Sequence, residues 1–326
     1  MKSNRNDILD WSDQGRIPAG RLREALQLAG VLPEAAGWRR FLDRMLLFMG
    51  VVLLGAAVIF FLAFNWQDLG RYAKFALAEV PILVALAFVW RAGVDAIAGK
   101  AALLFAALVA GALLALVGQT YQTGADTFEL FAAWAAAILP WVLVARFTPL
   151  WIFWLVLVNV AVALYFITLR FMWGMLFAPE KLLWLLFGLN TAALAAWEGL
   201  AAAGIEWLRE RWSVRLVATA SGALITALGL HDILDWQEPG REASHWGVPL
   251  WGLWIAAAYL AYRRWIRDVY VLAAGVLSVI VIVTAFVAKQ MTMRDGSGFL
   301  LLGLLVIGLS AAGGYWLKQV ATEEGA

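Results

Sequence analysis

The amino-acid sequence predicts an all-α fold: a polytopic transmembrane helix bundle of about ten spans, preceded by a short cytoplasmic N-terminal helical segment. Of the 326 residues, 63% are hydrophobic and 15% are charged, whereas a soluble domain is about half apolar and about one quarter charged. The apolar residues form continuous runs without Asp, Glu, Lys or Arg, which is typical of membrane helices. Clear examples are residues 45–64, 147–169, 269–288 and 296–317.

We place the transmembrane domain at residues 45–317, because runs of about 20 apolar residues match the roughly 30 Å hydrocarbon core of a bilayer. Inside that core, each backbone amide must be hydrogen-bonded within its own segment, so the runs are expected to be helical. The fourth, sixth, seventh and eighth spans have the shortest charge-free stretches and need charged residues at the headgroups to reach full thickness. The predicted spans are about 45–65, 72–90, 101–119, 128–145, 148–168, 181–200, 214–231, 247–263, 269–288 and 297–317.

Residues 1–44 differ in composition from the rest and are expected to form a cytoplasmic helical hairpin. The chain breaks between Gly15 and Pro18, and small or apolar residues then recur at three- and four-residue spacing from Leu22 to Ala29, which places them on one helix face. Such a hairpin either caps the membrane domain or docks a partner protein, and the sequence leaves both open. Its few arginines are too little basic charge for a nucleic-acid partner. The charged start of the segment also argues against a cleavable signal peptide.

The 25 Lys and Arg residues predict the orientation. Counted between the predicted spans, 18 lie on the side of the N-terminus and 7 on the opposite side. Because cytoplasmic loops retain an excess of Lys and Arg, both termini are predicted to be cytoplasmic, including the tail 318–326.

Small residues predict which spans lie at the centre of the bundle. Ala107, Gly111 and Ala115 recur at four-residue spacing in span three, and residues 218–223 of span seven are similarly small. Small residues let helix backbones approach closely, where lipid supplies no hydrophobic drive for association. Spans three and seven are therefore expected to be central, and spans five and nine peripheral. Similar segments beginning at Gly111 and Gly222 leave open a parallel four-helix repeat, with spans nine and ten appended.

The sequence contains no pattern of a known catalytic or metal site. It has no cysteine, which excludes disulfides and thiolate chemistry, and no phosphate-binding glycine loop, catalytic triad or zinc-protease motif. The two histidines, His231 and His245, lie with Asp232 and Asp235 in one polar loop without fixed spacing. We therefore assign no catalytic residue, metal or cofactor, and an enzyme is the less favoured class.

Glu79 is the sharpest candidate for a functional group. It lies in span two, about 10–12 Å below the outer surface by helical rise, and a carboxylate in the bilayer is unfavourable unless it is paired or neutral. We expect Glu79 to face the bundle interior. There it either carries a proton or contacts a solute, or it pairs with Arg71, Lys74, Gln119 or Asn65 to lock the packing. Pro81 loosens the same helix by removing a backbone donor.

A polar linker between spans three and four is the second candidate. Residues 118–126 read Gly-Gln-Thr-Tyr-Gln-Thr-Gly-Ala-Asp and form either a solvated hairpin or the lining of an outward-facing pocket. Two single amides elsewhere in the membrane, Asn159 and Asn190, are expected to form interhelical hydrogen bonds. Together with the end of span one, the candidate substrate-binding residues are Glu79, Asn65, Trp66, Gln119, Tyr121 and Asp126.

Three segments carry a resemblance to a known family: residues 11–18, the Phe-Asn-Trp end of residues 50–66, and the linker 118–126. Over about residues 5–145, the chain resembles the bacterial family of predicted membrane proteins catalogued as domain of unknown function 2157. The resemblance implies a multi-pass protein of the bacterial inner membrane. Because the activity of that family is not established, it adds no catalytic residue. It draws attention to Asn65, Trp66, Gln119, Tyr121 and Asp126.

Two functions of different classes follow. The first is a small-solute permease or exporter, in which the outer polar residues and Glu79 contact the solute or couple it to protons. The second is a non-transporting membrane scaffold or sensor that engages a membrane-protein partner through the N-terminal segment. A membrane-embedded enzyme acting on lipid or a lipid-linked sugar comes third, because no set of acid, base and nucleophile is visible. The lipid bilayer is the one partner common to all three.

Overall fold

The computed structural model describes residues 4–32, 35–65, 67–173, 179–234, 246–291 and 296–325. Every regular element in these ranges is a helix, which confirms the predicted all-α bundle. The helices are α1 (Asn4–Asp13), α2 (Leu22–Leu28), α3 (Ala35–Phe64), α4 (Arg71–Ala92), α5 (Ile97–Tyr121), α6 (Thr127–Ala145), α7 (Thr148–Trp173), α8 (Pro179–Ala202), α9 (Arg211–Leu234), α10 (Gly247–Leu260), α11 (Val269–Gln290) and α12 (Gly296–Gly325).

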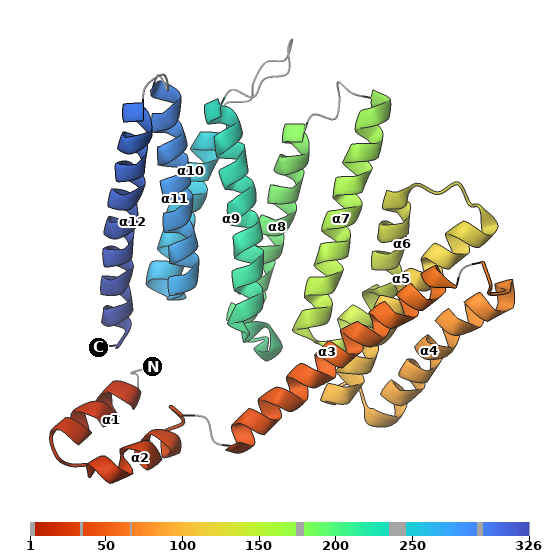
Figure 1. The fold of residues 1–326 in the computed structure, drawn as a ribbon, viewed down its shortest axis with the longest axis horizontal. Coiled ribbons are helices and arrows are strands. Elements are labelled where there is room, and N and C mark those ends of the chain that lie inside the picture. The colour runs from red at the N-terminus through yellow and green to blue at the C-terminus, as the bar shows by residue number, and fades with distance from the viewer. Residues whose placement is uncertain are drawn as a thin grey trace.

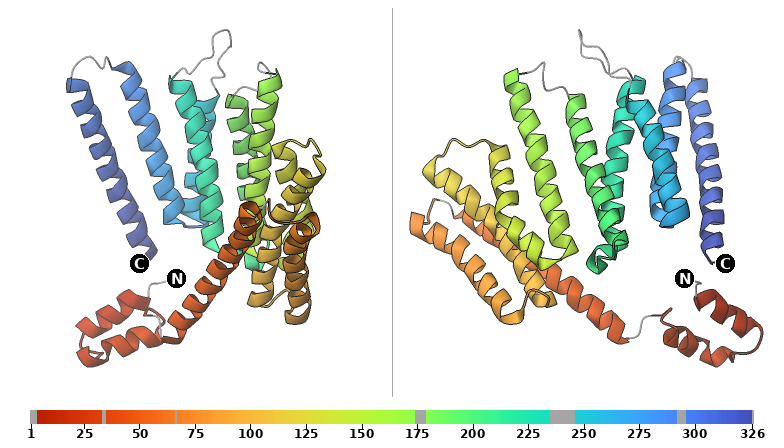
Figure 2. Two further views of the ribbon diagram at one scale, coloured as in Figure 1. Left: turned by 45° about the vertical axis from the view of Figure 1, so that its right-hand side comes forward. Right: turned by 180° about the vertical axis from the view of Figure 1, so that it is seen from behind.

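Within the described ranges, nine helices are long and apolar enough to cross a membrane, namely α3 to α9, α11 and α12. The predicted eighth span, 247–263, is the exception, because α10 has only 14 residues. Its helical path continues directly through a π-helical segment, Ala261–Trp265. Helix α10 and the π-helical segment together run beside α9 and lead into the turn before α11 (Figure 2). In the described part of the chain, the structure therefore has nine full-length apolar helices where the sequence predicts about ten spans, and the predicted eighth span is a short helix followed by a π-helical segment.

The membrane helices stand side by side (Figure 1). They bury two main apolar cores, and a smaller cluster of Leu62, Ala78 and Leu116 lies between α3, α4 and α5. Helices α3 to α7 form the first core, around residues such as Ala107 and Ile138. The second core lies among α7 to α12, around Val217 and Leu272. Helix α7 contributes to both cores: Leu157 is buried in the first, and Leu155, two residues earlier, is buried in the second. The helices around the first core, α3 to α7, are the first helix group, and those around the second core, α7 to α12, are the second helix group.

The two helices predicted to be central are the most buried ones. In their most apolar stretches, 50% of the residues of α5 and 44% of those of α9 are buried. The corresponding shares are 17–22% for α3, α4, α6, α7, α8 and α11, and no residue of that stretch is buried in α12. Each group is thus built around one helix that is rich in small residues, as the sequence predicts.

One glycine of α5 and one of α9, Gly111 and Gly222, each lie against a tryptophan ring. A Cβ atom on Gly111 would lie 2.4 Å from the Trp134 ring of α6, and the Trp134 indole donates to the Ala107 carbonyl at 2.7 Å. In the second group, a Cβ atom on Gly222 would lie 3.0 Å from the Trp254 ring of α10. The same contact therefore recurs in both helix groups, at the two segments whose sequences resemble each other.

Helices α1 and α2 form a hairpin that packs mainly on itself and lies apart from the membrane helices (Figures 1 and 2). Ile8 is buried inside this hairpin, whereas Trp11 and Leu28 are exposed. The predicted segment boundary at residue 44 falls within α3, because helix α3 begins at Ala35 and runs unbroken into the membrane helix. The hairpin and the last turns of α12 lie at the same end of the array (Figure 1).

Candidate functional site

Two of the residues predicted from the sequence serve the ends of their own helices. The Asn65 side chain donates to the Phe61 carbonyl at 2.9 Å at the end of α3. Asp126 is the N-cap of α6 and forms a capping box with Glu129, whose carboxylate accepts the Asp126 amide at 3.1 Å. Such bonds satisfy backbone groups that a helix end leaves unpaired. Trp66, the third predicted residue of this region, lies outside the described residues.

Gln119 and Tyr121 lie in the last turn of α5 and meet different neighbours. Arg71, the first residue of α4, donates to the Tyr121 hydroxyl at 2.6 Å, and its guanidinium carbon lies 4.7 Å from the centre of the Tyr121 ring. Gln119 lines a separate groove of about 300 Å³ between α3 and α5. The predicted set is therefore spread over several positions and does not surround one cavity.

Glu79 does not face the bundle interior, contrary to the prediction. Helix α4 packs against α5 through a face that includes Ala78, Ile82 and Val89. Successive helical residues are about 100° apart, so Glu79 lies beside that face and is exposed. Within the described part of the chain, its carboxylate has no hydrogen bond or ion pair.

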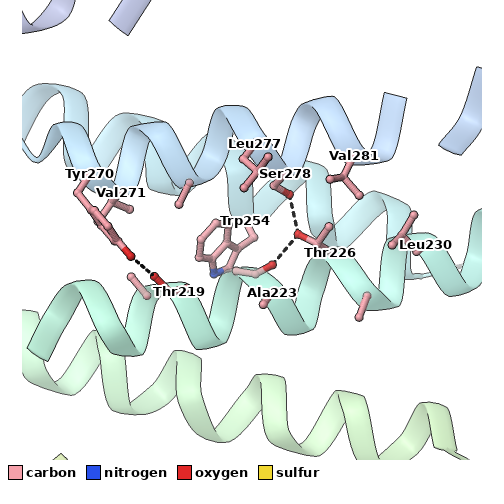
Figure 3. Close-up of a pocket in the computed structure, with 14 residues that line it drawn as sticks. Thr219, Ala223, Thr226, Leu230, Trp254, Tyr270, Val271, Leu277, Ser278 and Val281 are labelled. Atoms are coloured by element: carbon pink, nitrogen blue, oxygen red, sulfur yellow. Dashed lines mark hydrogen bonds between the residues drawn. The ribbon is translucent and has the colours of Figure 1, made fainter. Parts of the chain in front are cut away.

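A cavity of about 290 Å³ lies between α9, α10 and α11 (Figure 3). Its wall on α9 extends from Ala218 to Leu230 and is therefore centred on the middle turns of that helix. The small residues Gly222 and Ala223 leave the space open, and the Trp254 ring of α10 lies against it. The lining is apolar apart from a few hydroxyl groups, which is the usual composition of a site for a small molecule.

Hydroxyl groups in this cavity belong to a directed chain of hydrogen bonds, of which Figure 3 shows the bond between Thr226 and Ser278. The Trp251 indole donates to Ser278 at 2.8 Å, Ser278 and Thr226 lie 2.6 Å apart, and Thr226 donates to the Gly222 carbonyl at 2.6 Å. An indole only donates and a carbonyl only accepts, so Ser278 must donate to Thr226. Each hydroxyl oxygen then retains one free lone pair. The cavity consequently offers hydrogen-bond acceptors and no spare hydroxyl donor at this point.

A charged cluster closes the helix ends below the cavity, on the side where α9 begins. Arg211 of α9 donates to Asp268 at 2.9 and 3.0 Å and to both oxygens of Glu198 at 3.0 and 3.2 Å. Arg215, one turn further along α9, donates to Asp268 at 3.1 and 3.2 Å. Tyr262 of the π-helical segment donates to Glu198 at 2.9 Å. The cluster thereby ties α8, α9, the π-helical segment and the start of α11 together.

Asp268 is the centre of this cluster, and its side chain is only 1% exposed. Burial alone raises the pKa of a carboxyl group, but the hydrogen bonds from Arg215 and Arg211 outweigh burial and lower the pKa of Asp268 below its ordinary value. Asp268 also accepts the Tyr270 amide at 3.1 Å, as the N-cap of α11. The carboxylate therefore stays ionised and accepts hydrogen bonds from Arg211, Arg215 and the Tyr270 amide.

Tyr270 connects the charged cluster to the cavity. The guanidinium carbon of Arg215 lies 5.6 Å from the centre of the Tyr270 ring. The Tyr270 hydroxyl is 3.2 Å from that of Thr219, and both residues line the cavity (Figure 3). Tyr270 is therefore in contact with both the charged cluster and the lower end of the cavity.

This site does not follow from the sequence, in which the basic clusters indicate only the orientation of the helices. Asp268 directly follows Arg267, and Glu198 precedes the cluster of Arg209 and Arg211. Acidic residues at span ends beside several arginines were the available signal. Which arginine meets which acid depends on the rotation of four helices, and the sequence does not reveal that rotation.

Two other predictions concern the intramembrane amides Asn159 and Asn190 and the loop that contains the histidines. The predicted interhelical bond is confirmed, because the Asn190 amide of α8 donates to the Asn159 side chain of α7 at 2.6 Å. Asp232 of the histidine-containing loop accepts the Val248 amide at 3.1 Å near the start of α10. Asp235 and His245 lie outside the described residues.

Residues 9–151 match the model of a family described as Predicted membrane protein (DUF2157). The matched part begins in α1 and ends in the first turn of α7, so it contains the first four membrane helices and stops before the cavity. The resemblance over about residues 5–145 is thereby confirmed. No curated protein and no solved structure matches the chain.

Proposed function

We propose that this chain, a multi-pass membrane protein with its residues 9–151 in the pattern of a family of predicted membrane proteins, is a small-solute permease. The observation that carries the proposal is the cavity between α9, α10 and α11, centred on the middle turns of α9. Transporters hold their solutes near the middle of the bilayer, between packed helices. The second helix group is accordingly the transporting unit.

The solute class follows from the lining of the cavity. Thr226 and Ser278 each keep one acceptor lone pair, and the surrounding wall is apolar. A largely apolar solute with one N–H or O–H donor fits this lining. Its apolar part contacts the apolar wall, and its donor binds a hydroxyl oxygen of the cavity in place of water. A charged solute has no counter-charge among the residues that line this cavity.

The charged cluster serves in this proposal as the closed gate below the solute. Arg215 holds Tyr270 against Thr219 at the lower end of the cavity. Opening toward that side requires the Arg215–Asp268 pair to separate. We take that side to be the cytoplasm of a bacterial cell, in accordance with the 18-to-7 distribution of Lys and Arg and the resemblance to a bacterial family.

The outer residues predicted from the sequence have a secondary place in the proposal. Gln119 lines the groove between α3 and α5, and Tyr121 is held by Arg71 at the opposite end of the membrane. We keep Gln119 and Tyr121 as candidate contacts for solute that arrives from outside. Glu79 lies in the first helix group, so its substitution is a comparison for substitutions in the cavity.

The experiment is a thermal-unfolding screen in nanodiscs, with phenol, indole and short alcohols as probes and with their methyl ethers as matched molecules that lack the donor. The variants are Thr226→Val with Ser278→Ala, which removes both acceptors and keeps the volume nearly unchanged, and Glu79→Gln. A ligand at a hundred times its Kd stabilises the folded state by about 2.7 kcal/mol. We expect a donor-bearing probe to stabilise the wild type and the Glu79→Gln variant, and not the cavity variant.

A vesicle flux measurement with the stabilising probe completes the test. Protein-dependent flux that is lost in the cavity variant supports a permease. Binding without flux contradicts transport, and stabilisation that disappears only in Glu79→Gln assigns the solute to the first helix group instead.

A second candidate function, a scaffold or sensor, is favoured by the position of the α1–α2 hairpin. The hairpin packs on itself and exposes Trp11 and Leu28 rather than capping the membrane helices. In this case, deletion of residues 1–32 abolishes the ability of the gene to complement a deletion strain, whereas the cavity variant complements fully. The permease proposal expects the opposite pattern.

A further inference from the structure

We propose that α10, α11 and α12 form a binding site for one anionic glycerophospholipid, with the headgroup at an arginine pocket and an acyl chain in an adjoining apolar groove. This site lies on the other side of α10 and α11 from the solute cavity, and it does not depend on the permease function. Its occupant is a lipid of the leaflet on the side of the chain termini.

The headgroup pocket has a volume of about 430 Å³ and is lined by Tyr259, Arg263, Arg264, Arg267 and Glu323. Arg263 is paired with Glu323. Arg264 and Arg267 are exposed, and neither has a hydrogen bond or an ion pair within the described part of the chain. Two guanidinium groups thus remain for a ligand, and a guanidinium binds a phosphate with two parallel hydrogen bonds.

The acyl-chain groove begins where the headgroup pocket ends. Tyr259 lines both the pocket and a groove of about 320 Å³ between α10, α11 and α12. The groove is apolar, and small residues such as Gly275 and Ala312 leave its floor open. Along α11 it extends from Val271 to Ile280, which is about 14 Å at 1.5 Å per residue. That length equals about half of the roughly 30 Å hydrocarbon core, and hence one leaflet.

The charge of the pocket selects an anionic lipid over a zwitterionic one. Three arginines face one glutamate, so a phosphodiester without a compensating ammonium group balances the site. Basic pockets between membrane helices on the cytoplasmic side have this preference in general. The helix ends of α10 and α11 lie at the same end of the array as the last turns of α12 (Figure 1), so headgroup and chain occupy positions that a lipid spans without tilting.

The test is the affinity of the full chain for phosphatidylglycerol in phosphatidylcholine nanodiscs, measured by lipid titration and by native mass spectrometry of the retained lipid. The headgroup variant is Arg264→Gln with Arg267→Gln, and the groove variant is Gly275→Leu. The matched control is Arg91→Gln with Arg209→Gln, two exposed arginines at the same end of the array. Because each juxtamembrane arginine contributes about one factor of five in binding, we expect about a thirty-fold loss for the headgroup variant.

The expected result is one retained phosphatidylglycerol molecule on the wild type and the control, and its loss in both site variants. Equal retention of phosphatidylcholine overturns the proposal. A loss of the same size in the control overturns it as well, because general surface charge then suffices. The same titration with glycerol phosphate separates headgroup from lipid: binding as tight as that of phosphatidylglycerol excludes a role for the groove.

Discussion

Asp268 holds two guanidinium groups with one carboxylate, and Glu198 balances the charge by sharing Arg211. A buried ion pair does not by itself add much stability, because both charges lose their hydration. Removing one partner is nevertheless strongly unfavourable, since the remaining charge is left without compensation. Removing the Asp268 carboxylate leaves the most groups without their acceptor: the two arginines and the Tyr270 amide at the start of α11.

Asp268→Asn is therefore expected to destabilise the second helix group by about 2–3 kcal/mol, a value reduced from that of a fully buried pair because both arginines are partly exposed. Thermal unfolding in nanodiscs measures this change. Glu323→Gln is the control, since it removes only the exposed pair with Arg263, and it is expected to change the unfolding temperature little. Equal effects of the two substitutions would contradict the central role of Asp268.

The lowered pKa of Asp268 also predicts a direction for the pH dependence of stability. A carboxyl group whose pKa is lower in the folded state stabilises the protein fully above its unfolded value, here 3.8. That contribution is lost as the pH falls through 3.8 and then through the lower value of the folded state. We expect the unfolding temperature of the wild type to fall more steeply than that of Asp268→Asn below about pH 4, in a titration from pH 6 to pH 3.

At the scale of the helices, the contact between glycine and tryptophan organises both groups. Gly111 with Trp134 joins α5 to α6, and Gly222 with Trp254 joins α9 to α10. In each case, a tryptophan ring fills the slot that small residues leave on the central helix. The shared arrangement supports the idea of a four-helix repeat that the sequence raised, although the surrounding helices pack differently in the two groups.

Alanine at these glycines tests the arrangement, with Gly308 as the control. A Cβ atom on Gly111 would meet the Trp134 ring at 2.4 Å, whereas one on Gly222 would approach Trp254 at 3.0 Å, and one on Gly308 would meet no atom within 4 Å. We expect Gly111→Ala to destabilise by about 1–3 kcal/mol and Gly222→Ala by less. Gly308→Ala is expected to be neutral or stabilising, because alanine favours a helix. Thermal unfolding ranks the three variants.

The sequence predicted the existence of the helices and the central ones far better than their rotations. Runs of apolar residues fix where a helix crosses, and the small residues of α5 and α9 mark their central position. A helix that is apolar on all sides has no amphipathic pattern from which to read its buried face. The cost of a carboxylate in the bilayer predicts an interior Glu79, but the rotation of α4 leaves it exposed. The rotations of α8, α9 and α11 likewise determine the cluster around Asp268, which the sequence does not reveal.

At the scale of the whole molecule, the ends of the described chain lie on one side of the membrane helices, which makes orientation testable with single cysteines. The chain has no native cysteine, so Gln14→Cys, Thr123→Cys and Thr322→Cys each introduce one exposed thiol. On intact cells, an impermeant maleimide is expected to label Thr123→Cys only, and the other two after lysis. The reverse pattern would place the termini outside.

The two apolar cores, joined through opposite sides of α7, also have a consequence for heat denaturation. Leu155 and Leu157, two residues apart on α7, are buried in different cores, so each core has its own set of buried side chains, and Trp151 of α7 packs against both. We expect such a molecule to unfold as two cooperative units rather than one, so that a single melting temperature does not describe it. In a calorimetric scan, the heat is absorbed in two steps, and a substitution such as Asp268→Asn moves only the step that belongs to α8 to α12.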